Sequence, residues 1–71
     1  MTEIEIIEIG KMVVYNGMTI REIAEKLDIP RSKVHYTINN KLRQIDYDMY
    51  LAARKILESR YNGGRHEYKN I

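Results

Sequence analysis

Apolar residues recur three and four positions apart in four stretches of this 71-residue chain, and short polar turns separate the stretches. Such spacing places apolar side chains along one face of a helix. The pattern predicts an all-α fold, a small bundle of about four helices, with helices near residues 3–15, 20–27, 31–40 and 47–61. The segment IEIIEI near the start also alternates in part like a strand, but the length of the stretch and a capping signal before it favour a helix.

Residues that cap helices precede the predicted starts. Two Thr residues are each followed three positions later by Glu, which is the spacing of a capping box, and an Asp precedes the last helix. These residues are Thr2 with Glu5, Thr19 with Glu22, and Asp46. At the other ends, Asn16-Gly17 and Gly63-Gly64 accept a left-handed backbone, so we expect the first and last helices to end there.

The two middle helices have the pattern of a helix-turn-helix. Asp28 follows the apolar stripe of the first helix and is one of the few residues besides Gly that tolerate a left-handed backbone. Pro30 suits the start of the second helix, because an early helical amide has no partner. The expected buried residues of the motif are Ile20, Ile23, Ala24, Leu27, Val34 and Ile38.

The outward side of the second helix carries basic and hydrogen-bonding side chains and no carboxylate. This composition, with the small Ala24 where two helices approach closely, favours a DNA-binding motif over a simple αα-hairpin. The expected base-reading residues are Ser32, Lys33, His35, Tyr36 and Asn39. In the major groove Lys suits the acceptors of guanine, and Asn suits adenine.

Charge is unevenly distributed, although the formal net charge is only +2. The first nine residues contain three Glu, whereas residues 29–45 contain four Lys or Arg and no Asp or Glu. Positive and amide side chains in such a segment are expected to bind the DNA backbone. The expected phosphate-binding residues are Thr19, Arg21, Arg31, Asn40, Lys41, Arg43, Arg65 and Lys69. We therefore expect a helix-turn-helix DNA-binding domain over 1–62 and a basic, flexible C-terminal tail over 63–71.

Several kinds of chemistry find no support in the sequence. There is no Cys, and His35 and His66 lack the spacing of metal ligands, so neither a metal nor a cofactor is expected. No glycine loop precedes a helix and no His–carboxylate spacing is present, so we expect no enzyme. The chain begins without a signal-peptide pattern and has no run of about 20 apolar residues, which predicts a cytoplasmic protein, bound to the nucleoid when on DNA, with no membrane partner.

Three features, in this order, resemble the stage III sporulation protein D transcription regulators of endospore-forming bacteria. They are TIREIAEKLDIPRSKVH, then RQID before a helix, and RYNGG followed by a basic tail with Tyr68 and Lys69. The resemblance spans most of the chain. It implies a small regulator of sporulation genes that binds double-stranded DNA as a monomer, through the helix-turn-helix and a basic C-terminal region.

The resemblance also implies roles for single residues. Ser32 and His35 match DNA-facing positions of the family's reading helix, and Val34 matches a core position. Pro30 and Asp28 depart from the Ser and Gly that the family usually has there.

Three alternatives stay open. One is a protein interaction module whose helical hairpin docks on the transcription machinery, such as RNA polymerase, and which binds DNA without sequence preference. Another is a DNA-binding piece of a recombinase, if the chain is a fragment. The third concerns assembly. A homodimer through the helix at 47–61 would place two reading helices about one DNA turn, ~34 Å, apart.

Overall fold

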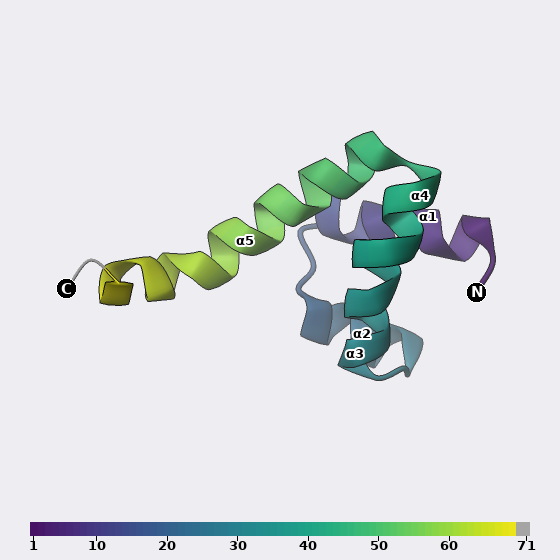
Figure 1. Ribbon diagram of the computed structural model, residues 1–71. Coiled ribbons are helices and arrows are strands. Elements are labelled where there is room, and N and C mark those ends of the chain that lie inside the picture. The colour runs from purple at the N-terminus through teal and green to yellow at the C-terminus, as the bar shows by residue number, and fades with distance from the viewer. Residues whose placement is uncertain (70–71) are drawn as a thin grey trace.

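Six helical segments follow one another along the chain in the computed structural model, which describes residues 1–69, with side chains described for residues 1–60 (Figure 1). They are α1 (Glu3–Val14), α2 (Ile20–Leu27), α3 (Arg31–Tyr36), the π-helical segment η1 (Thr37–Leu42), α4 (Arg43–Ile45) and α5 (Tyr47–Lys69). The predicted all-α class is confirmed. Since α3, η1 and α4 follow each other without a break, they form one continuous helix, called the 31–45 helix below.

The first helix begins at the predicted capping box. The Thr2 hydroxyl accepts a hydrogen bond from the Glu5 amide at 3.2 Å, and the Glu5 carboxylate accepts one from the Thr2 amide at 2.7 Å. This reciprocal pairing satisfies two amides that would otherwise lack partners at the helix start. The segment IEIIEI is therefore helical, and the strand alternative for it is wrong.

The turn after α1 uses Gly17 as expected, with a φ of +67°. A contact from far along the chain braces this turn. The guanidinium of Arg60, on α5, donates to the carbonyl oxygens of Gly17 at 2.6 Å and Met18 at 3.1 Å. The last helix thereby holds the backbone immediately before the helix-turn-helix.

The helix-turn-helix has the predicted boundaries at its turn. Thr19 and Glu22 form the second capping box, and α2 ends at Leu27. Asp28 then takes the left-handed conformation with φ 57° and ψ 48°, and the Ile29 amide donates to the Ala24 carbonyl at 3.0 Å. The chain turns sharply there and re-enters a helix after Pro30.

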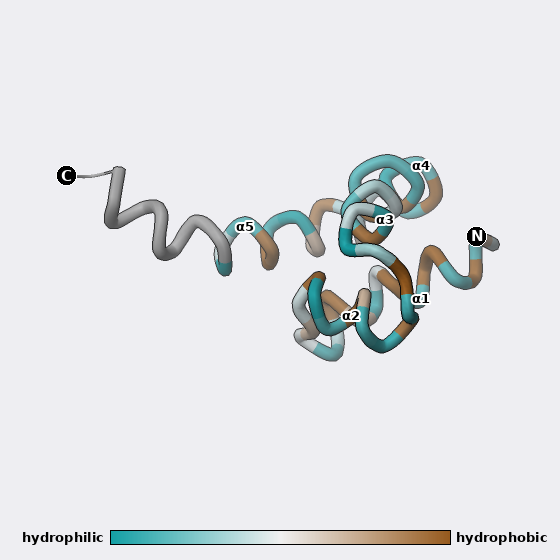
Figure 2. The backbone as a smooth tube through the Cα atoms, turned by 90° about the horizontal axis from the view of Figure 1, so that it is seen from below, coloured by the Kyte–Doolittle hydropathy of each residue, from teal (hydrophilic) through white to brown (hydrophobic). Residues whose placement is uncertain are grey.

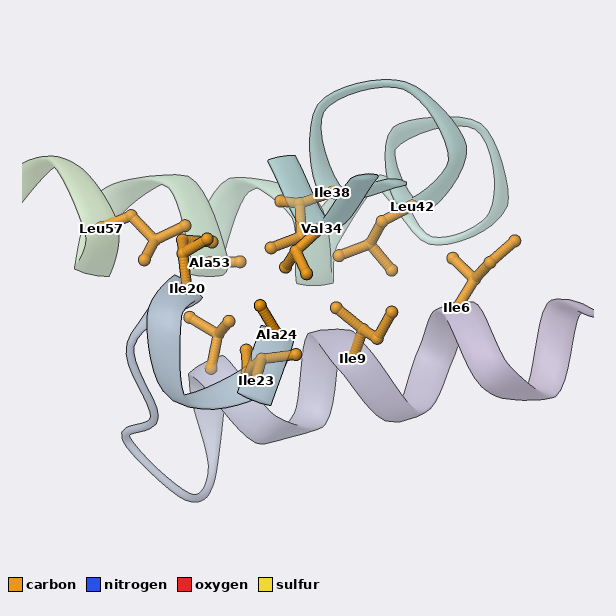
Figure 3. Close-up of a cluster of buried hydrophobic side chains, with 11 residues drawn as sticks. Ile6, Ile9, Ile20, Ile23, Ala24, Val34, Ile38, Leu42, Ala53 and Leu57 are labelled. Atoms are coloured by element: carbon orange, nitrogen blue, oxygen red, sulfur yellow. The ribbon is translucent and has the colours of Figure 1, made fainter. Parts of the chain in front are cut away.

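One apolar core joins all the larger helices (Figure 3). Its buried members are Ile6, Ile9, Val13, Ile20, Ile23, Ala24, Val34, Ile38, Leu42, Ala53 and Leu57. Figure 2 shows apolar and polar residues alternating along α1 and α2, as expected of helices with one buried face. On α1, Gly10 leaves room for α5: a Cβ there would lie 2.5 Å from the Met49 sulfur and 3.0 Å from a Leu42 methyl.

Two predicted helix ends need correction. The helix expected over 31–40 continues to Ile45, where Asp46 breaks it with φ −144° and then caps α5 by accepting the Met49 amide at 3.1 Å. The last helix does not end at Gly63-Gly64, because α5 runs to Lys69. Glycine also adopts right-handed helical dihedrals, at a cost of about 1 kcal/mol per residue relative to Ala. The sequence after the two glycines is polar, so it offers few apolar side chains that would favour a turn back onto the core. The division into a domain over 1–62 and a tail over 63–71 stays a prediction.

Candidate nucleic-acid interface

The outward face of α3 lies opposite two fully buried anchors. Val34 is 0% exposed and Ile38 is 1% exposed, which fixes the rotation of the helix on α2 and the core. With these two positions buried, Ser32, Lys33 and His35 are exposed as predicted. None of these three side chains makes a hydrogen bond or ion pair with another residue of 1–60. The face is held rigidly, yet its polar groups are available to a ligand.

Asn39 lies in a different environment from the other predicted base-reading residues. It is half-buried, and its side-chain oxygen accepts a hydrogen bond from the guanidinium of Arg54 at 3.2 Å. Arg54 in turn pairs with Glu58 at 2.8 Å. The Asn39 side chain thus links the 31–45 helix to α5, and it would have to exchange the Arg54 bond for a base.

Asn40 and Lys41 each contact Tyr36 on the exposed surface. Tyr36 is 56% exposed. The Asn40 amide donates to the Tyr36 carbonyl at 3.2 Å, and the Lys41 ammonium lies 6.0 Å from the centre of the Tyr36 ring. A cation over an aromatic face at this distance is weakly attracted to it.

The predicted phosphate-binding residues with described side chains lie at the start of α2 and along the 31–45 helix. Arg21, Arg31 and Arg43 are exposed, and Thr19 is half-buried. Arg21 is paired with Glu25 at 3.4 Å, and the Arg43 guanidinium lies 5.8 Å from the centre of the Tyr50 ring. Arg65 and Lys69 lie outside residues 1–60, the range for which the structure describes side chains.

The acidic start of α1 borders this basic face. Hydrogen bonds from the Thr2 backbone and then the Thr2 hydroxyl hold the pKa of the Glu5 carboxyl below its usual value, and the positive charges of the N-terminus and Lys33 lower it slightly further. Lys33 is therefore close enough to feel the Glu5 charge. Negative charge therefore lies beside Lys33, whereas Arg31, Lys41 and Arg43 have no carboxylate partner among residues 1–60.

Three residues that support the face were not predicted from the sequence. Arg54 and Arg60 act through contacts 15 and 42 or 43 residues away, and no local pattern indicates such pairs. Thr37 is 3% exposed, and its hydroxyl lies 3.9 Å from the Met1 sulfur. Its spacing, three residues after Val34, is the one signal that places it on the buried stripe.

Neither a metal-binding cluster nor a membrane-spanning helix is found within the part of the chain that the structure describes. Among the described residues, no group of three or more His, Asp and Glu is placed to hold a metal ion. No helix within them is long and apolar enough to span a bilayer. Inside residues 1–60 no fully buried side-chain nitrogen or oxygen lacks a hydrogen-bond partner.

Comparison with known proteins gives one clear result. No curated protein and no solved structure matches the chain. The family described as Stage III sporulation protein D matches residues 2–67, which is nearly the whole chain. This confirms the resemblance seen in the sequence. The chain belongs to the Stage III sporulation protein D family, a family of DNA-binding transcription regulators of sporulation, not of enzymes.

Proposed function

We propose that this regulator binds specific DNA sequences by placing the start of the 31–45 helix in the major groove. The observation that carries the proposal is the exposed, unpaired set Ser32, Lys33 and His35 on a helix whose opposite side is fully buried. A rigid helix with free donors and acceptors at its N-terminal end is the element that helix-turn-helix proteins use to read bases.

The side chains of this face suit particular base edges. Lys33 donates to the N7 and O6 acceptors of guanine, and Ser32 and His35 form single hydrogen bonds with several bases. Tyr36 and Asn39 complete the proposed base-reading set, with Asn39 binding adenine if it leaves Arg54. Each good contact of this kind discriminates against a wrong base by about 1–3 kcal/mol.

A second group of residues positions the helix through the DNA backbone. Phosphate contacts supply affinity that depends on salt and carry no sequence information by themselves. The proposed contacts are Thr19, Arg21, Arg31, Asn40, Lys41 and Arg43, together with Arg65 and Lys69. Of these, Arg31 and Arg43 lie in the acid-free segment and have no carboxylate partner among residues 1–60.

Selection of bound sequences from random DNA duplexes tests the proposal. We expect the parent chain to enrich one short motif, and Lys33→Ala to change the preferred base at one position of it. Lys55→Ala is the matched control, because Lys55 is an exposed lysine on α5, outside the proposed interface. If the parent chain enriches no motif, the proposal is wrong.

The same selection decides the assembly. Family resemblance favours a monomer, which would enrich an asymmetric site. A homodimer through α5 would enrich a palindrome, and exposed Tyr47 and Leu51, at 54% and 46%, are the apolar surface it would use.

The second candidate function is docking on another protein of the transcription machinery, such as RNA polymerase. An apolar groove of about 320 Å³ between α1 and the turn after α2 favours it. Ile4 at its edge is 76% exposed, and the charged residues lining it are Glu5 and Glu8. Binding of RNA polymerase without enrichment of any DNA motif would favour this function over sequence reading.

A further inference from the structure

A regular α-helix over residues 31–45 would bury a lysine, and the π-helical segment of this helix avoids that burial. Val34, Thr37 and Ile38 are all buried, and in an unbroken α-helix the centre of the same stripe passes next through position 41. That position is Lys41, and burying an unpaired ammonium in an apolar core is strongly unfavourable. Leu42 would lie only at the flank of the stripe.

The structure shows the opposite placement. Lys41 is exposed, and Leu42 is 0% exposed and packs in the core. Segment η1, over Thr37–Leu42, has the wider turn of a π-helix, with bonds between residues five apart. One extra residue is thereby accommodated within the helix, and the residues after it keep their contacts with α5.

Two contacts at the surface of η1 accompany the extra residue, and both are made to Tyr36. Residues five apart point in different directions on an α-helix, but in η1 the ammonium of Lys41 lies over the ring of Tyr36, five residues earlier. The Asn40 amide donates to the Tyr36 carbonyl, which ties the widened turn together. Lys41 therefore lies on the side of the helix that carries Tyr36.

We propose that η1 is a one-residue insertion in the reading helix that turns Lys41 out of the core and holds it over Tyr36 as a contact to a DNA backbone phosphate. This inference rests on the proposed DNA-binding function and adds to it the device that creates the contact. The ligand is a phosphodiester of the duplex that flanks the base-reading positions.

Deletion of Lys41 tests this directly. Deleting one residue from an α-helix rotates everything after it by about 100° and removes its apolar face from the core. Deleting Lys41 should instead convert η1 into ordinary α-helix with Leu42 still buried, so the urea midpoint should stay close to that of the parent. Deletion of Glu8, an exposed residue of the regular helix α1, is the matched control and should abolish cooperative unfolding.

DNA binding of the same variants tests the contact. Deletion of Lys41 and Lys41→Ala should weaken binding to the same extent and should each flatten the dependence of log K on log salt by about one unit. Three results would overturn the proposal: loss of folding on deletion of Lys41, parent-like binding by the deletion variant, or parent-like binding by Lys41→Ala. If the parent itself does not bind DNA, the proposed function fails, while the urea midpoint still decides whether η1 is an insertion.

Discussion

The two halves of the 31–45 helix both bury one side in the core but use their exposed sides differently. In α3, the side chains of Ser32, Lys33 and His35 are exposed and make no hydrogen bond or ion pair with residues 1–60. In η1, Asn39 is bound to Arg54 of α5, and Asn40 is bound to the carbonyl of Tyr36. These two side chains of the second half are thus already engaged within the protein.

This difference suggests a division of labour. The unbonded side chains of α3 can match the edges of bases. Asn39 and Asn40, which are bonded within the protein, instead fix the orientation of the helix relative to the rest of the fold. Arg54 and Arg60 extend the same role to α5, because one binds the second half of the reading helix and the other binds the turn before α2. We expect the first half to determine sequence preference and the second half to determine orientation and affinity.

The largest expected effect is on stability. Leu42→Ala should lower the free energy of unfolding by about 2–5 kcal/mol, as for other fully buried leucines, because the π-helical turn places Leu42 in the core. Chemical denaturation measures it, with Leu51→Ala as the control at a half-exposed position of α5. Equal, small losses for both variants would show that Leu42 lies outside the core.

The next effect distinguishes the two halves on DNA. Lys33→Ala should reduce discrimination at one base pair by about 1–3 kcal/mol. Asn39→Ala should change discrimination less, because its side chain is bound to Arg54. Affinities for the preferred duplex and for its single-base variants give both values. Greater relaxation by Asn39→Ala would assign base reading to the second half.

A smaller and uniform effect is expected at Arg43, near the end of the helix. Arg43→Ala should weaken binding to all sequences alike and flatten the salt dependence by about one unit of slope, because one phosphate contact is lost. Lys55→Ala serves as the charge-matched control. An unchanged slope for Arg43→Ala would remove this residue from the phosphate-binding set.

The smallest effect concerns the acidic edge beside Lys33. The hydrogen bonds from Thr2 lower the pKa of Glu5 from its ordinary 4.5 in the folded state. A carboxylate of this kind stabilises the fold above its pKa in the unfolded chain, and this stabilisation is lost as the pH falls through the lower folded pKa. The parent should therefore be slightly more stable than Glu5→Gln near neutral pH, and the difference should vanish in strongly acidic solution. A difference that persists there contradicts the role of the Glu5 charge.

Much of this fold follows from local signals in the sequence. The Thr–Glu spacings, Asp28 and Gly17 each act within a few residues, so the caps and turns they form were predictable. The π-helical turn was not, because it arises from competition between Lys41 and Leu42 for one place in the core. The braces from Arg54 and Arg60 were not either, since they join residues that only the folded chain brings together.

The candidate site divides in the same way. The helical spacing of Val34 and Ile38 alone predicted that Ser32, Lys33 and His35 would face outward, and the structure has them exposed. The same spacing also placed Asn39 outward, but its bond to Arg54 depends on how α5 crosses the 31–45 helix. The exposure of a side chain was therefore predictable from the spacing within one helix. Its hydrogen bond to another helix was not, because that bond depends on how the two helices pack.

The most direct test of this division is selection of bound duplexes by the parent, Lys33→Ala and Lys41→Ala, compared base by base. We expect Lys33→Ala to change the enriched motif, whereas Lys41→Ala should enrich the parent motif with lower affinity. A changed motif for Lys41→Ala together with an unchanged motif for Lys33→Ala would contradict it.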